Sequence, residues 1–280
     1  MSYNCFDVEV NNHIAHVQLS RPDALNAMNV DFWRELPELV ESIDAKGDAR
    51  VIVLSSTGKH FSAGMDLGVF TNPKNAPMTG DPGRMGENLR RIVLQLQSCL
   101  SSLEKIRIPV LSAIQGGCIG GALDMVCATD SRYCTEDAYF TIKETELGMT
   151  ADVGTLQRMP NLIPEGVLRE LAYTGRKLSA KEAHQLGFVN QVFADQQSMI
   201  DGVMTIASQI AKNSPLAVAG CKEMINYSRD HSVEDSLKYM ATWQSGMFRP
   251  NDMMKTFAAK AQKTEAEFDA IWPKKGLFES

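Results

Sequence analysis

Two short apolar segments of this chain are each followed by a glycine-rich loop, and this repeated pattern constrains the fold more than any other feature. Residues 50–55 are rich in Val, Ile and Leu, and Lys59-His60-Phe61-Ser62-Ala63-Gly64-Met65-Asp66-Leu67 follows them. Residues 109–115 are similarly apolar and lead into Gly116-Gly117-Cys118-Ile119-Gly120-Gly121-Ala122-Leu123-Asp124. Short apolar runs bounded by turn residues are typical of buried strands. The loops that follow them leave room for a ligand to reach backbone N–H groups.

The rest of the chain divides into a mixed part and a helical part. A hairpin is expected over residues 6–19, and the loop over 71–84 is rich in Pro, Gly and Asn and is expected to be mobile. Further strands are expected at 131–134, 138–142 and 188–192. Helices are expected at 31–45, 87–106, 121–127, 196–212, 215–229, 233–247 and 251–264. This order predicts an α/β core over residues 1–195 and a helical region over 196–280.

Composition excludes several classes of protein. The net charge of -6 argues against a nucleic-acid-binding protein, which needs a basic stripe. The six cysteines are scattered without a CxxC pair, and none of the five histidines falls in a metal-binding pattern, so no metal site is expected. The N-terminus lacks the pattern of a signal peptide, and no apolar run reaches the ~20 residues of a membrane span. We therefore expect a cytoplasmic protein.

The glycine loops are expected to present two backbone N–H groups. Gly121 is expected to begin the helix over 121–127, where free amides and the helix dipole favour developing negative charge. Met65 is expected to offer a second N–H from the first loop. The order G-G-C-I-G-G does not fit the dinucleotide-binding fingerprint G-x-G-x-x-G. A tight turn with close helix packing is the purely structural alternative, and Asp66 is equally a candidate helix N-cap.

Three acidic residues follow the second glycine loop at spacings of 20 and 8 residues. Asp124 lies in an apolar stretch, where a carboxylate is costly to bury unless it is paired or protonated. Of Glu144 and Glu146, one is expected to face solvent or cap a helix, and spacing does not choose between them. Asp152 taken alone is better explained as a helix cap. Backbone amides can stabilise the oxygen of an enolate, and acidic side chains can move protons to and from its carbon atoms. The two together point to enolate chemistry.

At these residues the chain resembles the crotonase family, also called the enoyl-CoA hydratase/isomerase superfamily. The resemblance runs from about Val8 to Phe268. It rests on L-S-R-P-D-A-L-N-A-M (19–28), H-F-S-A-G-M-D-L, I-Q-G-G-C-I-G-G-A-L-D and D-V-G-T-L-Q-R-M-P (152–160). The resemblance implies acyl-CoA substrates and a stack of ββα units. It also implies a helical C-terminal region that serves oligomerisation and covers CoA, in homotrimers or homohexamers.

The resemblance assigns roles to individual positions. The N–H groups of Met65 and Gly121 correspond to the oxyanion hole for the thioester oxygen. Lys260 resembles a C-terminal lysine that meets a CoA phosphate. The substrate-binding residues implied in this way are Ala24, Ala63, Gly64, Met65, Asp66, Leu67, Gly121 and Lys260.

The acids Asp124, Glu144 and Asp152 together resemble the set of the Δ3,5-Δ2,4-dienoyl-CoA isomerase branch. This implies a double-bond shift in fatty-acid β-oxidation, with Glu144 and Asp152 as the proton shuttle and Asp124 as a supporting group. No metal or redox cofactor is then required, because coenzyme A is part of the substrate. The alternative is a 2-enoyl-CoA hydratase, in which Asp124 and Glu144 hold water. A non-catalytic CoA-binding scaffold is a third hypothesis, which the three acids beside two amides argue against.

Overall fold

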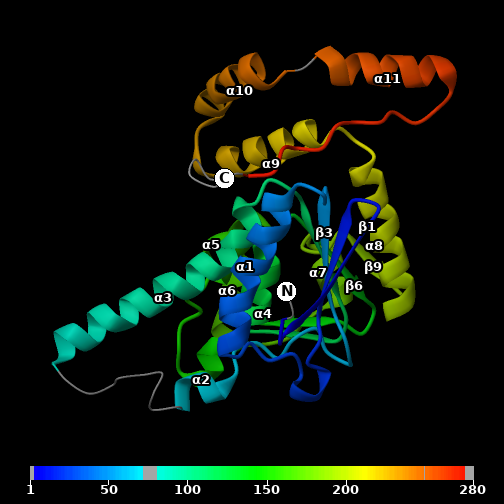
Figure 1. Ribbon diagram of the computed structural model, residues 1–280. Coiled ribbons are helices and arrows are strands. Elements are labelled where there is room, and N and C mark those ends of the chain that lie inside the picture. The colour runs from blue at the N-terminus through cyan, green and yellow to red at the C-terminus, as the bar shows by residue number, and fades with distance from the viewer. Residues whose placement is uncertain (1–2, 72–80, 249, 275–280) are drawn as a thin grey trace.

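The computed structural model describes residues 3–71, 81–248 and 250–274 (Figure 1). Six strands form the main sheet in the order β1-β2-β3-β4-β6-β9, and three short strands form a second sheet in the order β5-β7-β8. The strands are β1 Phe6–Asn11, β2 Ile14–Leu19, β3 Val51–Ser56, β4 Val110–Ile114, β5 Gly117–Ile119, β6 Ser131–Thr135, β7 Tyr139–Thr141, β8 Leu178–Ser179 and β9 Gln191–Phe193.

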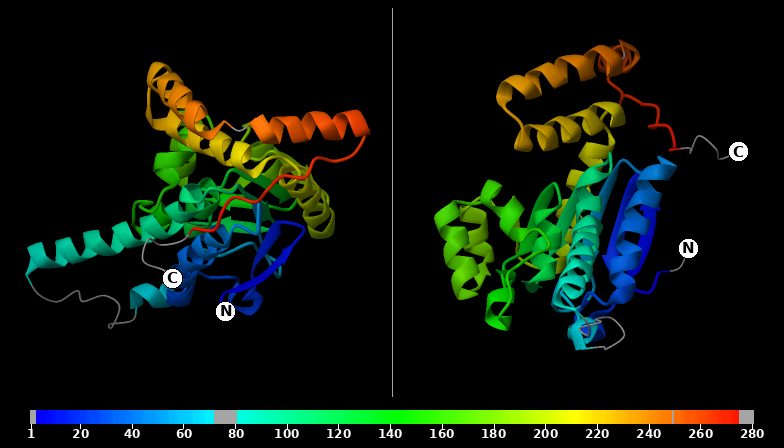
Figure 2. Two further views of the ribbon diagram at one scale, coloured as in Figure 1. Left: turned by 45° about the horizontal axis from the view of Figure 1, so that its top comes forward. Right: turned by 90° about the vertical axis from the view of Figure 1, so that its left-hand side faces the viewer.

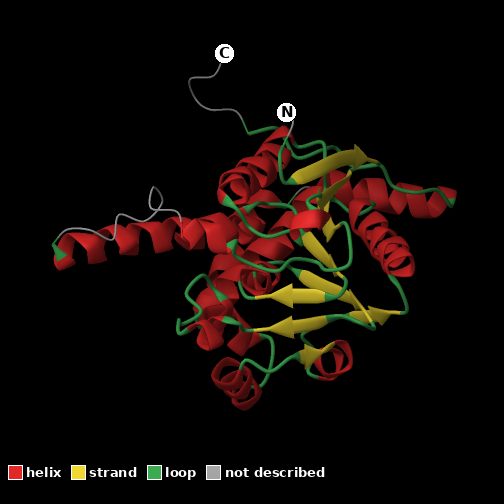
Figure 3. Ribbon diagram, turned by 90° about the horizontal axis from the view of Figure 1, so that it is seen from below, coloured by secondary structure: helices red, strands yellow, loops and turns green. Residues whose placement is uncertain are grey.

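Helices surround and extend this framework (Figure 3). The longer ones are α1 Val30–Lys46, α3 Pro82–Lys105, α6 Glu165–Thr174, α8 Gln196–Ala211, α9 Pro215–Asp230, α10 Val233–Met247 and α11 Pro250–Gln262. The shorter ones are η1 Pro22–Ala24, α2 Leu67–Thr71, α4 Gly121–Cys127, η2 Glu144–Leu147, α5 Thr155–Arg158, η3 Met159–Asn161 and α7 Ala180–Gln185. Among these described residues, no helix combines the length and apolar character that crossing a membrane requires.

The main sheet is buried on both faces, which explains the unbroken apolar runs of its strands. Val51 and Val53 of β3 face a cluster that includes Val203 of α8. Ile52 and Leu54 face the opposite cluster, to which α1 and α3 contribute. Apart from the antiparallel hairpin β1-β2, neighbouring strands in this sheet are parallel.

The chain repeats one order of elements: a strand of the main sheet, then a segment that joins the second sheet, then a helix. After β3, Ser62 forms a parallel bridge with Cys118 of β5, and β5 pairs in parallel with β7. The second sheet therefore stacks the loops that follow β3, β4 and β6 beside one another. This is the stack of ββα units that the sequence resemblance predicts, and the α/β fold is confirmed.

The helices α9, α10 and α11 lie beyond the end of the main sheet, whereas α8 packs on it (Figures 1 and 2). The segment that follows α11 returns to the body of the molecule. Its carbonyl groups at Phe268 and Trp272 accept hydrogen bonds from Arg50 and Arg107, respectively. We name α9, α10 and α11 the helical arm.

Two sequence expectations are corrected by the structure. The strand expected at 188–192 is β9 at 191–193, because Phe188 and Val189 are buried in the turn that ends α7. The helix expected from residue 87 begins at Pro82, because the Asp81 carboxylate accepts a hydrogen bond from the Arg84 N–H and caps it. Most of the loop expected over 71–84 lies outside the described residues.

Candidate active site

The first candidate amide belongs to Met65, and a β-bridge orients it. Met28 donates its N–H to the Gly64 carbonyl and accepts the Asp66 N–H, so Met28 pairs with the residues on either side of Met65. In a parallel bridge of this kind, the N–H of the central residue points away from the partner strand. The Met65 N–H has no backbone acceptor among the described residues. It is therefore available to a ligand on the side opposite Met28.

The second candidate amide belongs to Gly121, the first residue of α4. The Gly120 carbonyl accepts the N–H groups of Leu123 and Asp124, whereas the first residue of a helix has no intrahelical acceptor. Gly120 adopts φ +54, the left-handed region that favours glycine, and its own N–H donates to Thr141 of β7. The turn therefore leaves the Gly121 N–H at the start of the helix without an acceptor in the part of the chain that the structure describes.

The two amides are close to each other. A Cβ added to Gly121 would lie 3.6 Å from the Met65 nitrogen and 3.2 Å from the Met28 sulfur. A Cβ added to Gly64 would overlap the Ile119 carbonyl and lie 3.2 Å from the Gly121 nitrogen. The glycines of both loops therefore allow the loops to approach closely enough for their N–H groups to serve one oxygen atom.

Asp124 is fully buried on α4 and holds the start of another helix. Its Oδ1 accepts the Thr155 N–H at 2.5 Å, and Thr155 begins α5. Its Oδ2 is buried without a hydrogen-bond partner among the described residues. Burial is the main reason that the pKa of Asp124 rises to about 6. Asp124 thus caps α5, a role that sequence analysis assigned as the alternative for Asp152.

Glu144 begins η2 with its carboxylate beside the glycine turn of α4. A Cβ on Gly120 would lie 3.1 Å from Glu144 Oε1, and Oε2 is buried without a partner in the described residues. Burial and then the charge of Asp124 raise the pKa of Glu144 to about 7. Glu146, by contrast, is exposed and pairs with Lys143. The structure therefore distinguishes two glutamates that spacing left equivalent.

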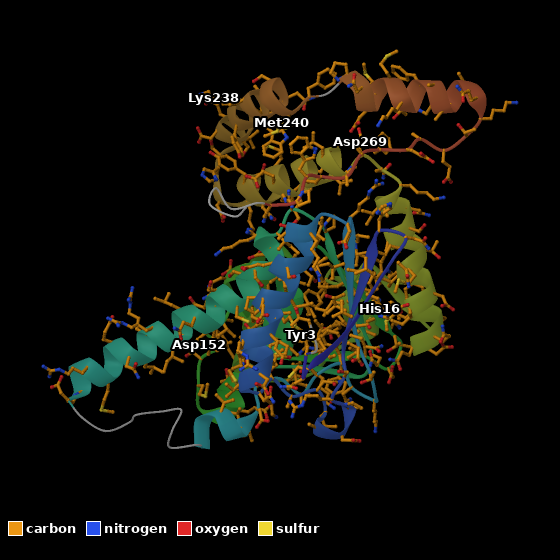
Figure 4. All side chains as sticks on the ribbon, viewed as in Figure 1. Tyr3, His16, Asp152, Lys238, Met240 and Asp269 are labelled. Carbon is orange, nitrogen blue, oxygen red and sulfur yellow. The ribbon has the colours of Figure 1, made fainter. Side chains whose placement is uncertain are left out.

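Asp152 is half-buried on the loop that leads into α5, beside α3 (Figure 4). Its carbonyl accepts a 2.6 Å hydrogen bond from Gln97 of α3. Burial raises the pKa of Asp152, and its charge in turn raises the pKa values of Asp124 and Glu144. The three acids therefore form one electrostatically coupled group.

The other sequence-predicted residues divide into two sets. Ala24 ends η1, and Ala63 lies next to it, because the Ala63 N–H donates to the Leu25 carbonyl at 3.0 Å. Asp66 accepts the Gly68 N–H at 2.8 Å, and Leu67 begins α2 with 62% of its surface exposed. Ala63, Gly64, Met65, Asp66 and Leu67 lie along the loop that follows β3, and Ala24 lies beside that loop on the segment that follows β2. Lys260 is exposed on α11, at the opposite end of the molecule from η1 and α2 (Figures 1 and 2).

Two residues that support the site are absent from the sequence predictions. Ser62 donates to the Asn26 carbonyl and accepts the Gly64 N–H, which fixes the turn before Met65. In the sequence, the only indication of this role is that Ser62 is a small polar residue directly before Ala63 and Gly64. Gln97 lies in the middle of a long helix, where nothing in the sequence distinguishes it. In the ranges that the structure describes, no cluster of three His, Cys, Asp or Glu residues is arranged to hold a metal ion.

Comparisons with known proteins agree with this architecture. The profile of the family described as Enoyl-CoA hydratase/isomerase matches residues 9–270. The mitochondrial Delta(3,5)-Delta(2,4)-dienoyl-CoA isomerase of Mus musculus is 43% identical, over 91% of this chain and 78% of that protein. The peroxisomal protein of that name from Arabidopsis thaliana is 42% identical, over 91% and 92%. The crystal structure of enoyl-CoA hydratase from Bacillus anthracis superposes with a TM-score of 0.84 at 27% identity, covering 95% of this chain and 99% of that one.

Proposed function

The chain belongs to the enoyl-CoA hydratase/isomerase family, and we propose that within it the protein is a Δ3,5-Δ2,4-dienoyl-CoA isomerase. The observation that carries this proposal is the coupled group of Asp124, Glu144 and Asp152 beside two free backbone amides. The identity of 42–43% to relatives named for this activity supports it further.

The amides of Met65 and Gly121 bind the thioester oxygen in this proposal. Removal of a proton from C2 of a 3,5-dienoyl-CoA moves negative charge onto that oxygen and along the conjugated chain to C4 and C6. Donors that are already oriented stabilise this charge without reorganising during the reaction. The dipole of α4 acts in the same sense.

Glu144 and Asp152 move the protons. One carboxylate takes the C2 proton, and the other carboxyl group delivers a proton to C6, so both double bonds move into conjugation with the carbonyl and no atom is gained or lost. This needs one ionised and one protonated acid at the same pH. The pKa of about 7 for Glu144 and the raised pKa of Asp152 suit such an exchange near neutrality. No metal or redox cofactor takes part in this scheme.

Asp124 supports the shuttle without touching the substrate. Its Oδ1 is committed to the Thr155 N–H, which fixes the loop that carries Asp152. Its charge also raises the pKa of Glu144. The alternative, a 2-enoyl-CoA hydratase, requires Asp124 and Glu144 to hold a water molecule together. The bond to Thr155 leaves Asp124 only Oδ2 for that task, so we favour the isomerase.

In this proposal the CoA portion lies between Ala24 on η1 and the loop that follows β3, along Ala63, Gly64, Asp66 and Leu67. Lys260 is too remote to join the groove of its own chain, and we assign it to the groove of a second copy within a homotrimer or homohexamer. Exposed apolar side chains on the helical arm, such as Met240 and Phe257, support such an assembly. The cytoplasmic location stays a prediction, since the relatives named above are mitochondrial or peroxisomal proteins.

One experiment tests the activity directly. The purified protein is mixed with a 3,5-dienoyl-CoA and, separately, with a 2-enoyl-CoA, and ultraviolet absorbance is followed. Growth of the conjugated dienoyl-thioester band with the first substrate is the expected result. Loss of enoyl absorbance with the second substrate, without the first change, would replace the isomerase by the hydratase.

A further inference from the structure

A chain of three charged residues connects the helical arm to the loop that carries Asp152. The Glu104 carboxylate on α3 accepts one hydrogen bond of 2.7 Å from Arg158 of α5 and another of 2.7 Å from Arg229 of α9. The side chains of Arg158 and Glu104 are each only 14% exposed, whereas that of Arg229 is 32% exposed. The two arginines therefore share one acid but lie in different surroundings.

Arg158 also lies directly against the Asp152 loop. Its Nη1 approaches the Val153 carbonyl at 3.5 Å, and its Nη2 donates to Ser101 at 2.9 Å. Gly154 has φ +142, and a Cβ added there would overlap the guanidinium. The loop therefore depends on glycine at this position partly because the Arg158 side chain packs across its backbone.

We propose that Arg158, held in place by Glu104, is a positioning residue for the loop that carries Asp152. This inference rests on the proposed isomerase, in which Asp152 must meet one end of the substrate's conjugated chain. The loop is then fixed at three points: by Asp124 at the Thr155 N–H, by Gln97 at the Asp152 carbonyl, and by Arg158 across Val153 and Gly154.

The planar guanidinium suits this task for a geometric reason. Its separate nitrogens reach Glu104 and Ser101 on α3 and the loop on the other side at once, which a single ammonium group cannot do. The nearby cation also lowers the pKa of Asp124, in opposition to burial. Arg158 thus contacts the loop that carries Asp152 and also acts on the charge of Asp124, which holds the same loop at Thr155.

Arg229 provides a matched control, because it binds the same carboxylate from the side away from the loop. For Arg158→Met we expect kcat on a 3,5-dienoyl-CoA to fall about 10- to 100-fold with KM little changed, since small displacements of a catalytic group have effects of this size. Arg158→Lys should also have a lowered kcat, because lysine restores the positive charge but not the separate nitrogens of the planar guanidinium. Arg229→Met should keep kcat within about twofold, as expected for a more exposed ion pair.

Amide hydrogen exchange over residues 152–155 gives a readout that does not need activity. Exchange should accelerate in Arg158→Met and stay at the wild-type rate in Arg229→Met. If Arg158→Met does not fold, Glu104→Gln takes its place, with a loss of kcat and faster exchange expected.

A wild-type kcat in Arg158→Met would overturn the inference. It would also be overturned if the Arg158 and Arg229 variants lost kcat equally and in proportion to a loss of thermal stability. A wild-type protein without dienoyl isomerisation would refute the proposed function instead. In that case the amide exchange rates over residues 152–155 would still test whether Arg158 positions the loop.

Discussion

Helices α4 and α10 differ in the way that their residues are buried, and the difference separates the two regions of the molecule. All seven residues of α4 are buried, including the carboxylate of Asp124, and the helix lies in the middle of the ββα stack. None of the 15 residues of α10 is buried, although Met240 and Met247 are among them. The single chain therefore buries α4 completely but leaves every residue of α10 at least partly exposed.

The two regions also differ in which side chains are buried and which are exposed. Around α4, burial raises the pKa values of Asp124 and Glu144. On the arm, apolar side chains line a groove between α9, α10 and α11, and Trp243, Met247 and Met253 contribute to it. Apolar surface of this kind generally marks a contact with another molecule. Substitutions in the first region should thus alter chemistry, and those in the second should alter assembly.

The largest effect is expected at the acid that distinguishes isomerase from hydratase. Asp152→Asn keeps the shape but removes the acid, so isomerisation should fall about 10²- to 10⁴-fold, as is typical when a general acid or base is lost. Rates of dienoyl-CoA conversion measure the effect. Glu146→Gln is the control, because Glu146 is exposed on η2 outside the coupled group and should keep full activity. Wild-type isomerisation by Asp152→Asn would remove this residue from the shuttle.

The next effect concerns the amide of Gly121. In Gly121→Val the side chain would press on the Met28 sulfur and on the space beside the Met65 nitrogen. The substitution keeps the N–H but displaces the thioester oxygen from the two donors, so we expect a loss of kcat similar to the loss of one donor, about 10²- to 10³-fold, in steady-state assays. Gly166→Ala serves as the control, because Gly166 is an exposed position on α6 where an added Cβ meets no atom within 4 Å. A folded Gly121→Val protein with full turnover would contradict the oxyanion-hole assignment.

A smaller effect should be visible in stability. The pKa of Glu144 rises from 4.5 to about 7 on folding, so between these values the folded state binds more protons than the unfolded state. The free energy of unfolding should therefore fall as the pH rises through this window. One pKa unit corresponds to about 1.4 kcal/mol, so Glu144→Gln should reduce the pH-dependent change by roughly 1–3 kcal/mol.

Urea unfolding near pH 5 and near pH 8 measures this difference. Glu146→Gln should keep the wild-type dependence on pH. Asp124 contributes in the same direction, because its pKa also rises, to about 6. Parallel pH profiles for the wild type and Glu144→Gln would show that the raised pKa does not belong to Glu144.

The smallest effect on the fold of the single chain is expected on the arm. Met240→Glu replaces a side chain that is 38% exposed, so the stability of the monomer should change by no more than about 0.5 kcal/mol. The mass in solution should nevertheless fall from a trimer or hexamer toward the 30.9 kDa of one chain. Light scattering measures this mass, and Ala241→Glu is the control for added charge, because Ala241 is exposed on the same helix and does not line the groove. A wild-type protein that is monomeric at working concentration would exclude the assembly.

Local patterns in the sequence predicted most of the elements and pointed to the two loops of the candidate site. The helix at 121–127 and the hairpin at 6–19 follow from residue types and spacing, because each is determined by neighbours a few positions away. The position of β9 was predicted wrongly, since Phe188 and Val189 resemble strand residues but are buried in a turn. Whether a short apolar run becomes a strand depends on the partner it meets, which local sequence does not contain.

The sequence by itself determined that two glycine loops present amides and that acids follow them, because turn chemistry and burial tendencies act on neighbouring residues. Only the tertiary structure decided that Glu144 and not Glu146 faces the glycine turn, and that Asp124 caps the helix after Asp152. It also placed Arg158 across that loop and Lys260 far from the other residues that we propose to bind substrate. These relations join residues that are distant in the chain, and they arise when parallel strands bring successive loops to one edge of the stack.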